Sequence, residues 1–308
     1  MAKPVAAAAD RYRGALLGLA IGDALGAAVE FKPPGTFDLV TDMRSGGPHG
    51  IVAGEWTDDT SMALCLAESL VECRGFDPVD QLRRYVSWWR EGHLSSTGRC
   101  FDIGISTRAA LARFEQTGEP YCGSEDPYSA GNGSLMRLAP IPLAYAGDLA
   151  AAAARSGEGS RTTHAAAAAV DACRYFGFLL ACAVGGADKA ALLSPEIWTE
   201  GPLVSEVAEV ASGSYRENDP SEIVGSGYVV RSLEAALWAF ASTSSFEAGA
   251  LAAVNLGDDA DTTGAIYGQL AGVYYGAEKI PFRWRENLAH RELIIEYADR
   301  LHDLAFET

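Results

Sequence analysis

Two segments near opposite ends of the chain place glycine at every fourth position. They hold Gly14, Gly18, Gly22 and Gly26, and then Gly264, Gly268, Gly272 and Gly276. A four-residue spacing aligns the glycines along one face of a helix, where the missing side chains allow close backbone approach. Each interior glycine costs roughly 1 kcal/mol of helix stability relative to alanine, so close packing has to offset that cost. We therefore expect two tightly packed core helices that form a rigid base for the residues at their ends.

Neither glycine-rich segment is predicted to cross a membrane. Asp23 interrupts the first segment, and Tyr, Gln and Asp residues interrupt the second, before about 18 uninterrupted apolar residues accumulate. Residues 1–13 lack an apolar stretch followed by a cleavage site, so we expect no signal peptide. The six cysteines form no C-x-x-C pair. These features predict a cytoplasmic protein with free thiols.

Apolar residues recur at helical spacing through most of the remaining chain, as over 61–70. Alternating runs typical of strands are few, and no segment has the composition of a flexible linker. The sequence therefore predicts an all-α fold with one domain over residues 1–308. The predicted helices cover 10–28, 58–74, 78–91, 104–116, 134–146, 161–184, 225–241, 246–256, 260–276 and 283–306, and the Ala-rich stretch 149–154 is also helical.

Two short segments concentrate carboxylates and hydroxyls in the first turn of a predicted helix. They are Thr57-Asp58-Asp59-Thr60 and Asp258-Asp259-Ala260-Asp261-Thr262. Helix capping would account for one or two acids at either place. Adjacent carboxylates repel unless a cation or a proton intervenes, and hard oxygen ligands suit Mg²⁺, Mn²⁺ or Ca²⁺. The spacing leaves both interpretations open; if the clusters meet in space, they suit a two-metal centre with ions about 3.5–4 Å apart.

A third acidic pair, Asp23 and Glu30, lies among apolar residues near the first glycine stripe. The two positions are seven apart and would share a face on a continuous helix. An acid among Leu, Ala, Val and Phe is costly to bury without a partner. Glu30 either ends the helix in solvent or belongs to a site.

The net charge of −17 limits the ligands that this chain can attract. Such a charge repels nucleic acid and anionic membranes, so general nucleic-acid binding and membrane binding are not expected. An anionic ligand would bind only where the local site overcomes this field, and bound metal cations are one way to do so. The sequence shows no heptad that would predict an oligomeric state.

Four motifs occur in a fixed order over residues 11 to about 285. They are GDALGAAVEF at 22–31, TDDT at 57–60, GNGSLMR at 131–137 and DADTTG at 259–264. Their order and approximate spacing resemble those of the ADP-ribosylhydrolases related to the dinitrogenase-reductase-activating glycohydrolase. The resemblance implies a compact orthogonal multi-helix bundle with a cleft that holds two divalent cations, Mg²⁺ or Mn²⁺. It also implies hydrolysis of the bond between a target and the C1″ carbon of ADP-ribose.

The resemblance assigns roles to individual positions. The metal ligands that it implies are Thr57, Asp58, Asp59, Asp259, Asp261 and Thr262. It implies catalytic roles for Glu30, Asp58 and Asp259, and Glu30 matches an acid that activates water or holds the ribose. A loop whose backbone approaches the phosphates and distal ribose matches Gly131, Asn132, Gly133 and Ser134. Glycine suits such a loop because an anion can approach the backbone closely.

Three further positions match substrate-binding residues, each with an alternative role. His164 resembles a histidine that contacts the substrate, although a lone histidine is more often structural. Asp102 resembles an acid near an arginine leaving group, and it either binds a guanidinium or caps the next helix. Tyr228 either stacks on adenine or packs in the core. Asp258, where relatives commonly have glycine, either adds charge beside the metals or points to solvent.

The expected activity is metal-dependent release of ADP-ribose from an ADP-ribosylated protein or small molecule, with arginine as the first expected target. Serine, ester, guanidine and nucleic-acid linkages remain open. Three alternatives compete with this activity. They are another two-metal hydrolase of the phosphoesterase type, a catalytically silent ADP-ribose binder, and a helical protein stabilised by Ca²⁺.

Overall fold

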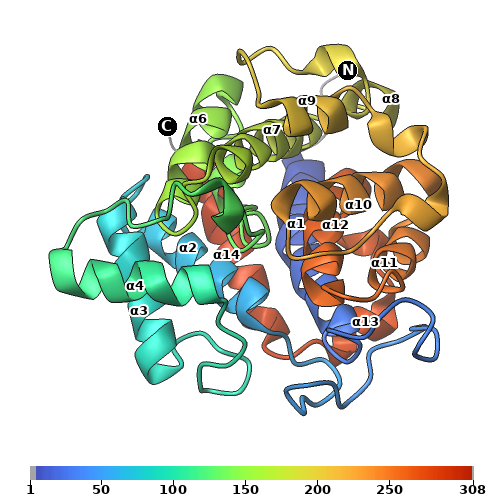
Figure 1. Ribbon diagram of the computed structural model, residues 1–308, viewed down its shortest axis with the longest axis horizontal. Helices are drawn as coiled ribbons and strands as arrows, with labels where there is room; N and C mark the ends of the chain where they lie inside the picture. Colours follow the sequence, from blue (N-terminus) through green and yellow to red (C-terminus); the bar gives the residue numbers. More distant parts are fainter. Residues whose placement is uncertain (1–4, 307–308) are drawn as a thin grey trace.

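Two long helices, α1 (Val5–Gly26) and α12 (Ala260–Tyr275), lie side by side at the centre of the molecule (Figure 1). The computed structural model describes residues 5–306. The two glycine stripes face each other in antiparallel register, with the pairs Gly14 and Gly272, Gly18 and Gly268, and Gly22 and Gly264. A Cβ at any of these positions would overlap a backbone carbonyl of the opposite helix. The prediction of two tightly packed core helices is confirmed.

This antiparallel register determines which ends of the two helices meet. The C-terminal end of α1 lies beside the N-terminal end of α12. Gly26, the last residue of α1, packs against the backbone of Ala260 and Asp261 at the start of α12. The acidic residues near the end of α1 therefore lie beside the acidic cluster that opens α12. The rigid pair of helices holds both groups at one place.

The remaining helices surround this pair and share one cluster of buried hydrophobic residues with it. No β-strand occurs within residues 5–306, which confirms the all-α prediction. The longer helices are α2 (Asp58–Glu72), α3 (Pro78–Glu91), α4 (Ile105–Thr117), α6 (Leu149–Arg161), α7 (Ala167–Val184), α10 (Val229–Ser242), α11 (Phe246–Val254) and α14 (Arg291–Phe306). The short ones are α5 (Pro140–Ala144), α8 (Lys189–Leu192), α9 (Ser205–Ala211) and α13 (Phe282–Asn287).

Three predicted helices are wrong in extent. The helix expected over 134–146 is only α5, because residues before Pro140 form turns and proline fixes the start of a helix. The helix expected over 161–184 begins at α7, since the Thr162 side chain bonds back to the Gly159 carbonyl and ends α6. The helix expected over 283–306 is divided into α13 and α14, and His290 between them has a φ of 51°.

Helix α7 is long and apolar enough to cross a membrane by length and composition alone. Inside the fold, 67% of this helix is buried. It packs against α6, α10 and α12, so its apolar character is that of a core helix.

Candidate active site and metal centre

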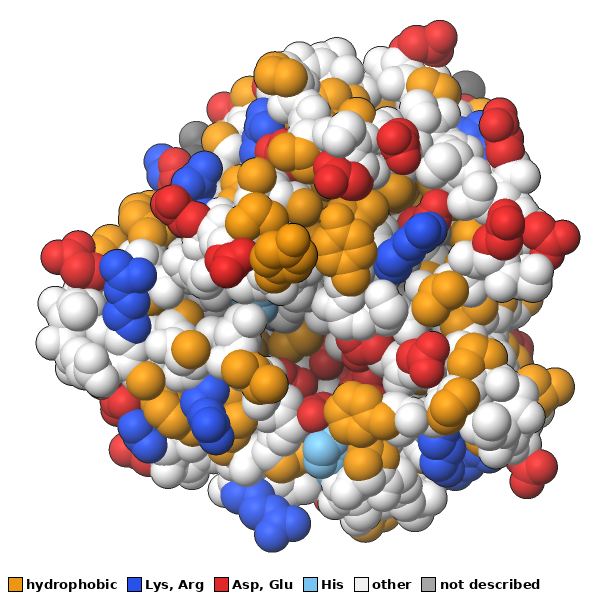
Figure 2. All heavy atoms as spheres, viewed as in Figure 1, with side chains coloured by type: hydrophobic (Ala, Val, Ile, Leu, Met, Phe, Trp, Pro, Cys, Tyr) orange, Lys and Arg blue, Asp and Glu red, His pale blue; other side chains and the backbone are white. Residues whose placement is uncertain are grey.

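An open pocket of about 730 Å³ lies where the ends of α1, α2 and α12 meet. Figure 2 shows this hollow with Asp and Glu side chains at its base and hydrophobic side chains around its rim. Its volume lies in the usual range of pockets for small ligands and cofactors. Ten predicted site residues line it: Glu30, Asp58, Asp102, Gly131, Asn132, Gly133, His164, Asp259, Asp261 and Thr262.

Asp23 holds the start of α2 in place from the neighbouring helix α1. Its carboxylate accepts hydrogen bonds from the backbone N–H and hydroxyl of both Thr57 and Thr60, at 2.6–3.1 Å. Asp23 and Glu30 do not share a helix face, because α1 ends at Gly26 and turns follow. The sequence analysis noted Asp23 but gave it no role; its position beside the TDDT motif is a long-range contact.

Capping does not explain the two acidic clusters. The residues at the N-caps of α2 and α12 are Thr57 and Asp259, and neither side chain makes a capping hydrogen bond. Asp102 does not cap α4 either, since Gly104 occupies that N-cap. These side chains are instead turned toward one another or toward the pocket.

The two acidic clusters meet at Thr57. Its hydroxyl oxygen lies 3.1 Å from Oδ2 of Asp59 and 3.4 Å from Oδ2 of Asp261. Carboxylate oxygens of Asp23, Asp59 and Asp261 all lie within 4.8 Å of one another. Asp59 and Asp261 are 1% exposed, and the Oδ1 atom of each has no hydrogen-bond partner within the described residues. Both oxygens of Asp23, by contrast, accept hydrogen bonds, so Asp23 positions the cluster.

Burial raises the pKa of every carboxyl group in this cluster. The pKa values of Asp58, Asp59 and Asp261 are well above the usual range because of burial and the neighbouring carboxylates. The pKa of Asp259 is also raised by burial, against a hydrogen bond that Asn132 donates at 2.7 Å. Buried carboxylates at this density are stable only with protons or a cation among them.

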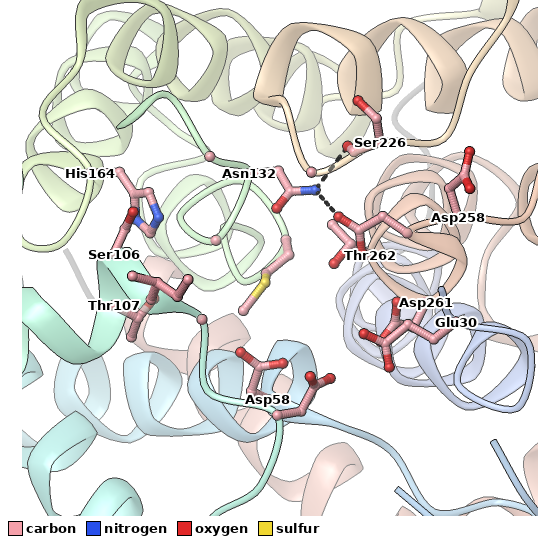
Figure 3. A pocket seen from close by; sticks show the side chains of 18 of the residues that line it. Glu30, Asp58, Ser106, Thr107, Asn132, His164, Ser226, Asp258, Asp261 and Thr262 are labelled. Atoms are coloured by element: carbon pink, nitrogen blue, oxygen red, sulfur yellow. Dashed lines mark hydrogen bonds between the residues drawn. The ribbon is translucent and has the colours of Figure 1, made fainter. Parts of the chain in front are cut away.

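The donor set fits a hard divalent cation. It combines carboxylate and hydroxyl oxygens with no thiol, and two buried oxygens lack any other partner. Asp58, Asp259 and Thr262 line the same pocket as Asp261 (Figure 3). The structure thus brings together all six residues that the sequence predicted as metal ligands, with Thr57 and Asp59 buried behind the pocket lining.

Glu30 and Asp102 share a histidine that the sequence analysis missed. His49 Nε2 lies 3.0 Å from Glu30 Oε2 and 3.1 Å from Asp102 Oδ1. Burial, and then the neighbouring acids, raise the pKa of Glu30 to about 10 and that of Asp102 to about 7. Burial lowers the pKa of His49. A histidine in the run GGPHG, between two motifs rich in acids, was the signal available in the sequence.

Three non-glycine residues of the pocket lining have a left-handed backbone. Phe31, Asp102 and Asp258 have φ values of 60°, 59° and 50°. Such conformations are uncommon for bulky residues and gather at functional sites. The backbone of Asp258 pairs with Phe31 and Lys32, which ties the segment after α1 to the one before α12. Asp258 lines the pocket and is half-buried.

The predicted phosphate loop forms the side of the pocket opposite Asp261 and Glu30 (Figure 3). Its glycines make room for a histidine ring: a Cβ at Gly133 would lie 2.8 Å from Cε1 of His164. The loop is held at Asn132, whose backbone N–H donates to Gly227 and whose side chain donates to Ser232 and Asp259.

Two predicted substrate residues do not line the pocket. The hydroxyl of Ser134 is buried and bonds to Ser160 at 2.8 Å, so this side chain belongs to the core. Tyr228 is 39% exposed, which is incompatible with a core role, and its backbone pairs with Gly131. Several lining residues received no role from the sequence, among them Ser106, Thr107, Met136, Ser226 and Gly227.

Comparison with known proteins connects this geometry to one family. A family model described as ADP-ribosylglycohydrolase matches residues 4–308. The chain is 41% identical over 99% of its length to the ADP-ribosylarginine hydrolase Tri1 of Serratia proteamaculans, covering 82% of that protein. It is 44% identical over 97% of its length to the ADP-ribosylarginine hydrolase Tri1 of Pseudomonas putida, covering 79% of that protein.

A more distant relative and a solved structure agree with these matches. The ADP-ribosyl-[dinitrogen reductase] glycohydrolase of Rhodospirillum rubrum is 32% identical over 91% of the chain, with 90% of that protein covered. A solved structure described as an ADP-ribosylglycohydrolase-related protein complex superposes with a TM-score of 0.88. It is 47% identical, and the match covers 98% of this chain and 100% of that one.

Proposed function

The chain belongs to the ADP-ribosylglycohydrolase family, and on this premise we propose that it uses divalent cations to release ADP-ribose from ADP-ribosylated arginine. The observation that carries the proposal is the meeting of two distant acidic clusters at Thr57, beside a pocket that also holds Asp102. The relatives named ADP-ribosylarginine hydrolase support arginine as the linkage.

We propose that two cations, Mg²⁺ or Mn²⁺, are held by the six ligands Thr57, Asp58, Asp59, Asp259, Asp261 and Thr262. When bound, such cations supply Lewis-acid polarisation of ribose oxygens and of water. The unpartnered oxygens of Asp59 and Asp261 support this assignment, because a buried carboxylate oxygen is costly without a proton or a cation.

The carboxylates around the pocket also suit the positive charge that develops on the ribose during the reaction. Breaking the bond at C1″ builds positive charge on the ribose, which nearby carboxylates stabilise. We propose that Glu30 carries the proton in this step, as base or acid. Its raised pKa, about 10, leaves it protonated at neutral pH in the metal-free chain, and His49 can hold its Oε2 in position.

Asp102 is the proposed contact for the arginine leaving group. A carboxylate can accept two parallel hydrogen bonds from a guanidinium. Asp102 lines the pocket, and its titratable neighbours include Asp58 and the imidazole of His49. We also propose a cytoplasmic location, which rests on the cysteine pattern in the sequence.

A substrate panel tests the proposed function. ADP-ribosylarginine, ADP-ribosylserine and an ADP-ribose ester would be incubated with Mg²⁺, Mn²⁺ or chelator. We expect free ADP-ribose from the arginine substrate with either metal and none with chelator. Release of inorganic phosphate instead would indicate the phosphoesterase type, and tight ADP-ribose binding without turnover would indicate a silent binder.

A further inference from the structure

A buried arginine without an acidic partner lies behind the pocket. The side chain of Arg137 is 1% exposed, and its partners in the part of the chain that is described are neutral. Nη1 donates to the carbonyl of Gly133 at 3.0 Å, and Nη2 donates to the hydroxyls of Thr163 at 2.7 Å and Thr162 at 3.3 Å. The guanidinium also lies over the Tyr85 ring, with Cζ 4.6 Å from the ring centroid, so the groups around this buried cation are polar or aromatic rather than acidic.

Thr163 connects Arg137 to His164. The Thr163 hydroxyl oxygen lies 2.9 Å from Nδ1 of His164. A guanidinium can only donate hydrogen bonds, so the oxygen of Thr163 is the acceptor toward Arg137. The single hydroxyl proton of Thr163 then needs an acceptor of its own, because a buried donor without a partner is costly. Within residues 5–306, Nδ1 of His164 is the one acceptor that the structure places within hydrogen-bond reach of this hydroxyl, at 2.9 Å.

This arrangement fixes the tautomer of His164. If Nδ1 accepts a hydrogen bond, the proton of a neutral imidazole is on Nε2. A charged ring is disfavoured, since burial and the nearby Arg137 guanidinium lower the pKa of His164 to about 3. His164 is therefore a neutral ring whose only N–H is at Nε2.

The Nε2 atom faces the glycine loop of the pocket. A Cβ on Gly133 would lie 3.2 Å from Nε2 of His164, and a Cβ on Gly131 would lie 3.5 Å from it. The backbone of His164 is held on both sides, because its N–H donates to Ser160 at 2.7 Å and its carbonyl accepts from the Ser160 hydroxyl at 2.7 Å. The ring therefore has a fixed direction as well as a fixed tautomer.

Arg137 also orients a peptide of the same loop. The carbonyl of Gly133 points toward Arg137, and no cis peptide bond occurs within the described residues. In a trans peptide the next N–H, that of Ser134, points the opposite way. The hydrogen bond from Arg137 therefore keeps the negative end of the Gly133 carbonyl dipole directed away from the part of the pocket that His164 lines.

We propose that Arg137 and Thr163 are positioning residues that hold His164 as an Nε2–H donor to the diphosphate of ADP-ribose. The identity of this ligand rests on the proposed function. The neighbours of the ring at the pocket, Gly131, Gly133 and Thr107, are uncharged, and the carboxylate of Asp259, which reaches the same loop, accepts a hydrogen bond from Asn132. The buried positive charge of Arg137 favours an anionic oxygen over a neutral hydroxyl as the acceptor.

Nitrogen-15 NMR of the histidine rings tests the tautomer in the free protein. The signals of His164 would be identified by their loss in His164→Ala. We expect a neutral Nε2–H ring in the wild type and in Thr163→Ser, and a changed tautomer or ring environment in Thr163→Val. Thr162→Val is the matched control, since Thr162 is equally buried and bonds to Arg137 but not to His164. An Nδ1–H ring or an imidazolium in the wild type would overturn the proposal.

Binding of ADP-ribose, measured by titration calorimetry in chelator, tests the ligand. We expect Thr163→Val to weaken binding roughly tenfold, which is the size of one hydrogen bond to a charged group, with Thr163→Ser restoring most of it. Adenosine, which lacks phosphate, is expected to bind equally to wild type and Thr163→Val. Equal loss with Thr162→Val, or equal loss for adenosine, would overturn the positioning role. If the wild type binds ADP-ribose neither in chelator nor with saturating Mg²⁺, the proposed function fails, while the NMR result still decides whether Thr163 sets the tautomer of His164.

Discussion

Within the described residues, the two sides of the pocket bury groups of opposite charge type that lack an oppositely charged partner. On one side, Asp59 and Asp261 each have a buried oxygen that accepts no hydrogen bond within residues 5–306, and burial raises the pKa of both carboxyl groups. On the other side, the Arg137 guanidinium is buried among neutral groups, and His164 is uncharged. Figure 3 shows His164 across the pocket from Asp261 and Glu30.

A chain selected for stability alone would pair these charges with each other. Removing one partner of a buried ion pair costs about 3–5 kcal/mol, because the remaining charge is buried without compensation. The two sides are kept apart because they rest on different elements: the acids on the ends of α1, α2 and α12, and Arg137 on the loop before α5. We infer that each side binds a ligand of opposite charge. Cations bind at the acidic cluster, and a diphosphate binds beside His164. This separation answers how a chain of net charge −17 can bind an anion.

The largest effect on activity is expected from removing one of the proposed metal ligands. Asp58→Ala and Asp259→Ala should each lower kcat/KM by roughly 10³-fold or more, because cation binding and stabilisation of the ribose charge are lost together. Release of ADP-ribose from the arginine substrate measures this. Near-normal turnover of arginine, serine and ester substrates by both variants would contradict the metal assignment.

The Asp58→Ala variant also tests whether the acidic side of the pocket and the side that carries His164 act separately. In chelator, ADP-ribose binding by Asp58→Ala should equal or exceed that of the wild type, since one repulsive carboxylate has been removed. Circular dichroism would establish that the variant remains folded. Weaker binding by the folded variant would mean that the acids contact the anion directly, and the two sides would not be separate.

Metal removal should destabilise the protein more as the pH rises. A carboxyl with a folded pKa above its unfolded value stabilises the fold at low pH, and this contribution is lost as the pH rises through the folded pKa. For Asp102 that pKa is about 7, and for Glu30 about 10, so the metal-free Tm should fall between pH 5.5 and 8. Saturating Mn²⁺ should raise Tm by roughly 5 °C at pH 8 and less at pH 5.5, where protons compete. A Tm increase that is independent of pH would contradict this account.

The two acidic clusters that meet at Thr57 could be recognised in the sequence because their signals are local. Consecutive acids and hydroxyls at a helix start, as in the TDDT motif, are visible without knowledge of the fold. The glycine stripes predicted the packing of two helices, although their antiparallel register came only from the structure. That register is what places Asp261 within 3.4 Å of Thr57.

The sequence predicted the opposite side less well because its features depend on long-range contacts. Arg137 stands in a quoted motif, but nothing local indicates that its guanidinium would be buried without an acid. On the acidic side, the contact of His49 with Glu30 and Asp102 was missed for a related reason, because His49 lies in a Gly/Pro-rich loop where periodicity carries no information. The glycines of the loop were explained by the approach of an anion, whereas the structure shows that the His164 ring occupies the space over Gly133.

A smaller and more selective effect is expected at the edge where Asp102 lies. Asp102→Asn should reduce kcat/KM for ADP-ribosylarginine about tenfold, because a charge-assisted pair with the guanidinium becomes a neutral one. The serine substrate has no guanidinium and should be affected less. Because Asp102 Oδ1 also lies 3.1 Å from His49 Nε2, His49→Ala is the control for lost positioning of the carboxylate. Equal losses on both substrates would show that Asp102 does not select arginine.

The smallest expected effect tests whether His164 acts through its position. Gly133 has no left-handed φ, so alanine is compatible with its backbone, but the added Cβ would lie 2.8 Å from Cε1 of His164. The ring must tilt by a few tenths of an ångström, and ADP-ribose affinity should fall about threefold, well under the effect of losing a hydrogen bond. A double-mutant cycle with His164→Ala isolates the cause, because the penalty of Gly133→Ala should vanish once the ring is absent. If calorimetry finds the same penalty without the ring, the alanine obstructs the ligand directly, and the loop glycines serve the anion as the sequence first indicated.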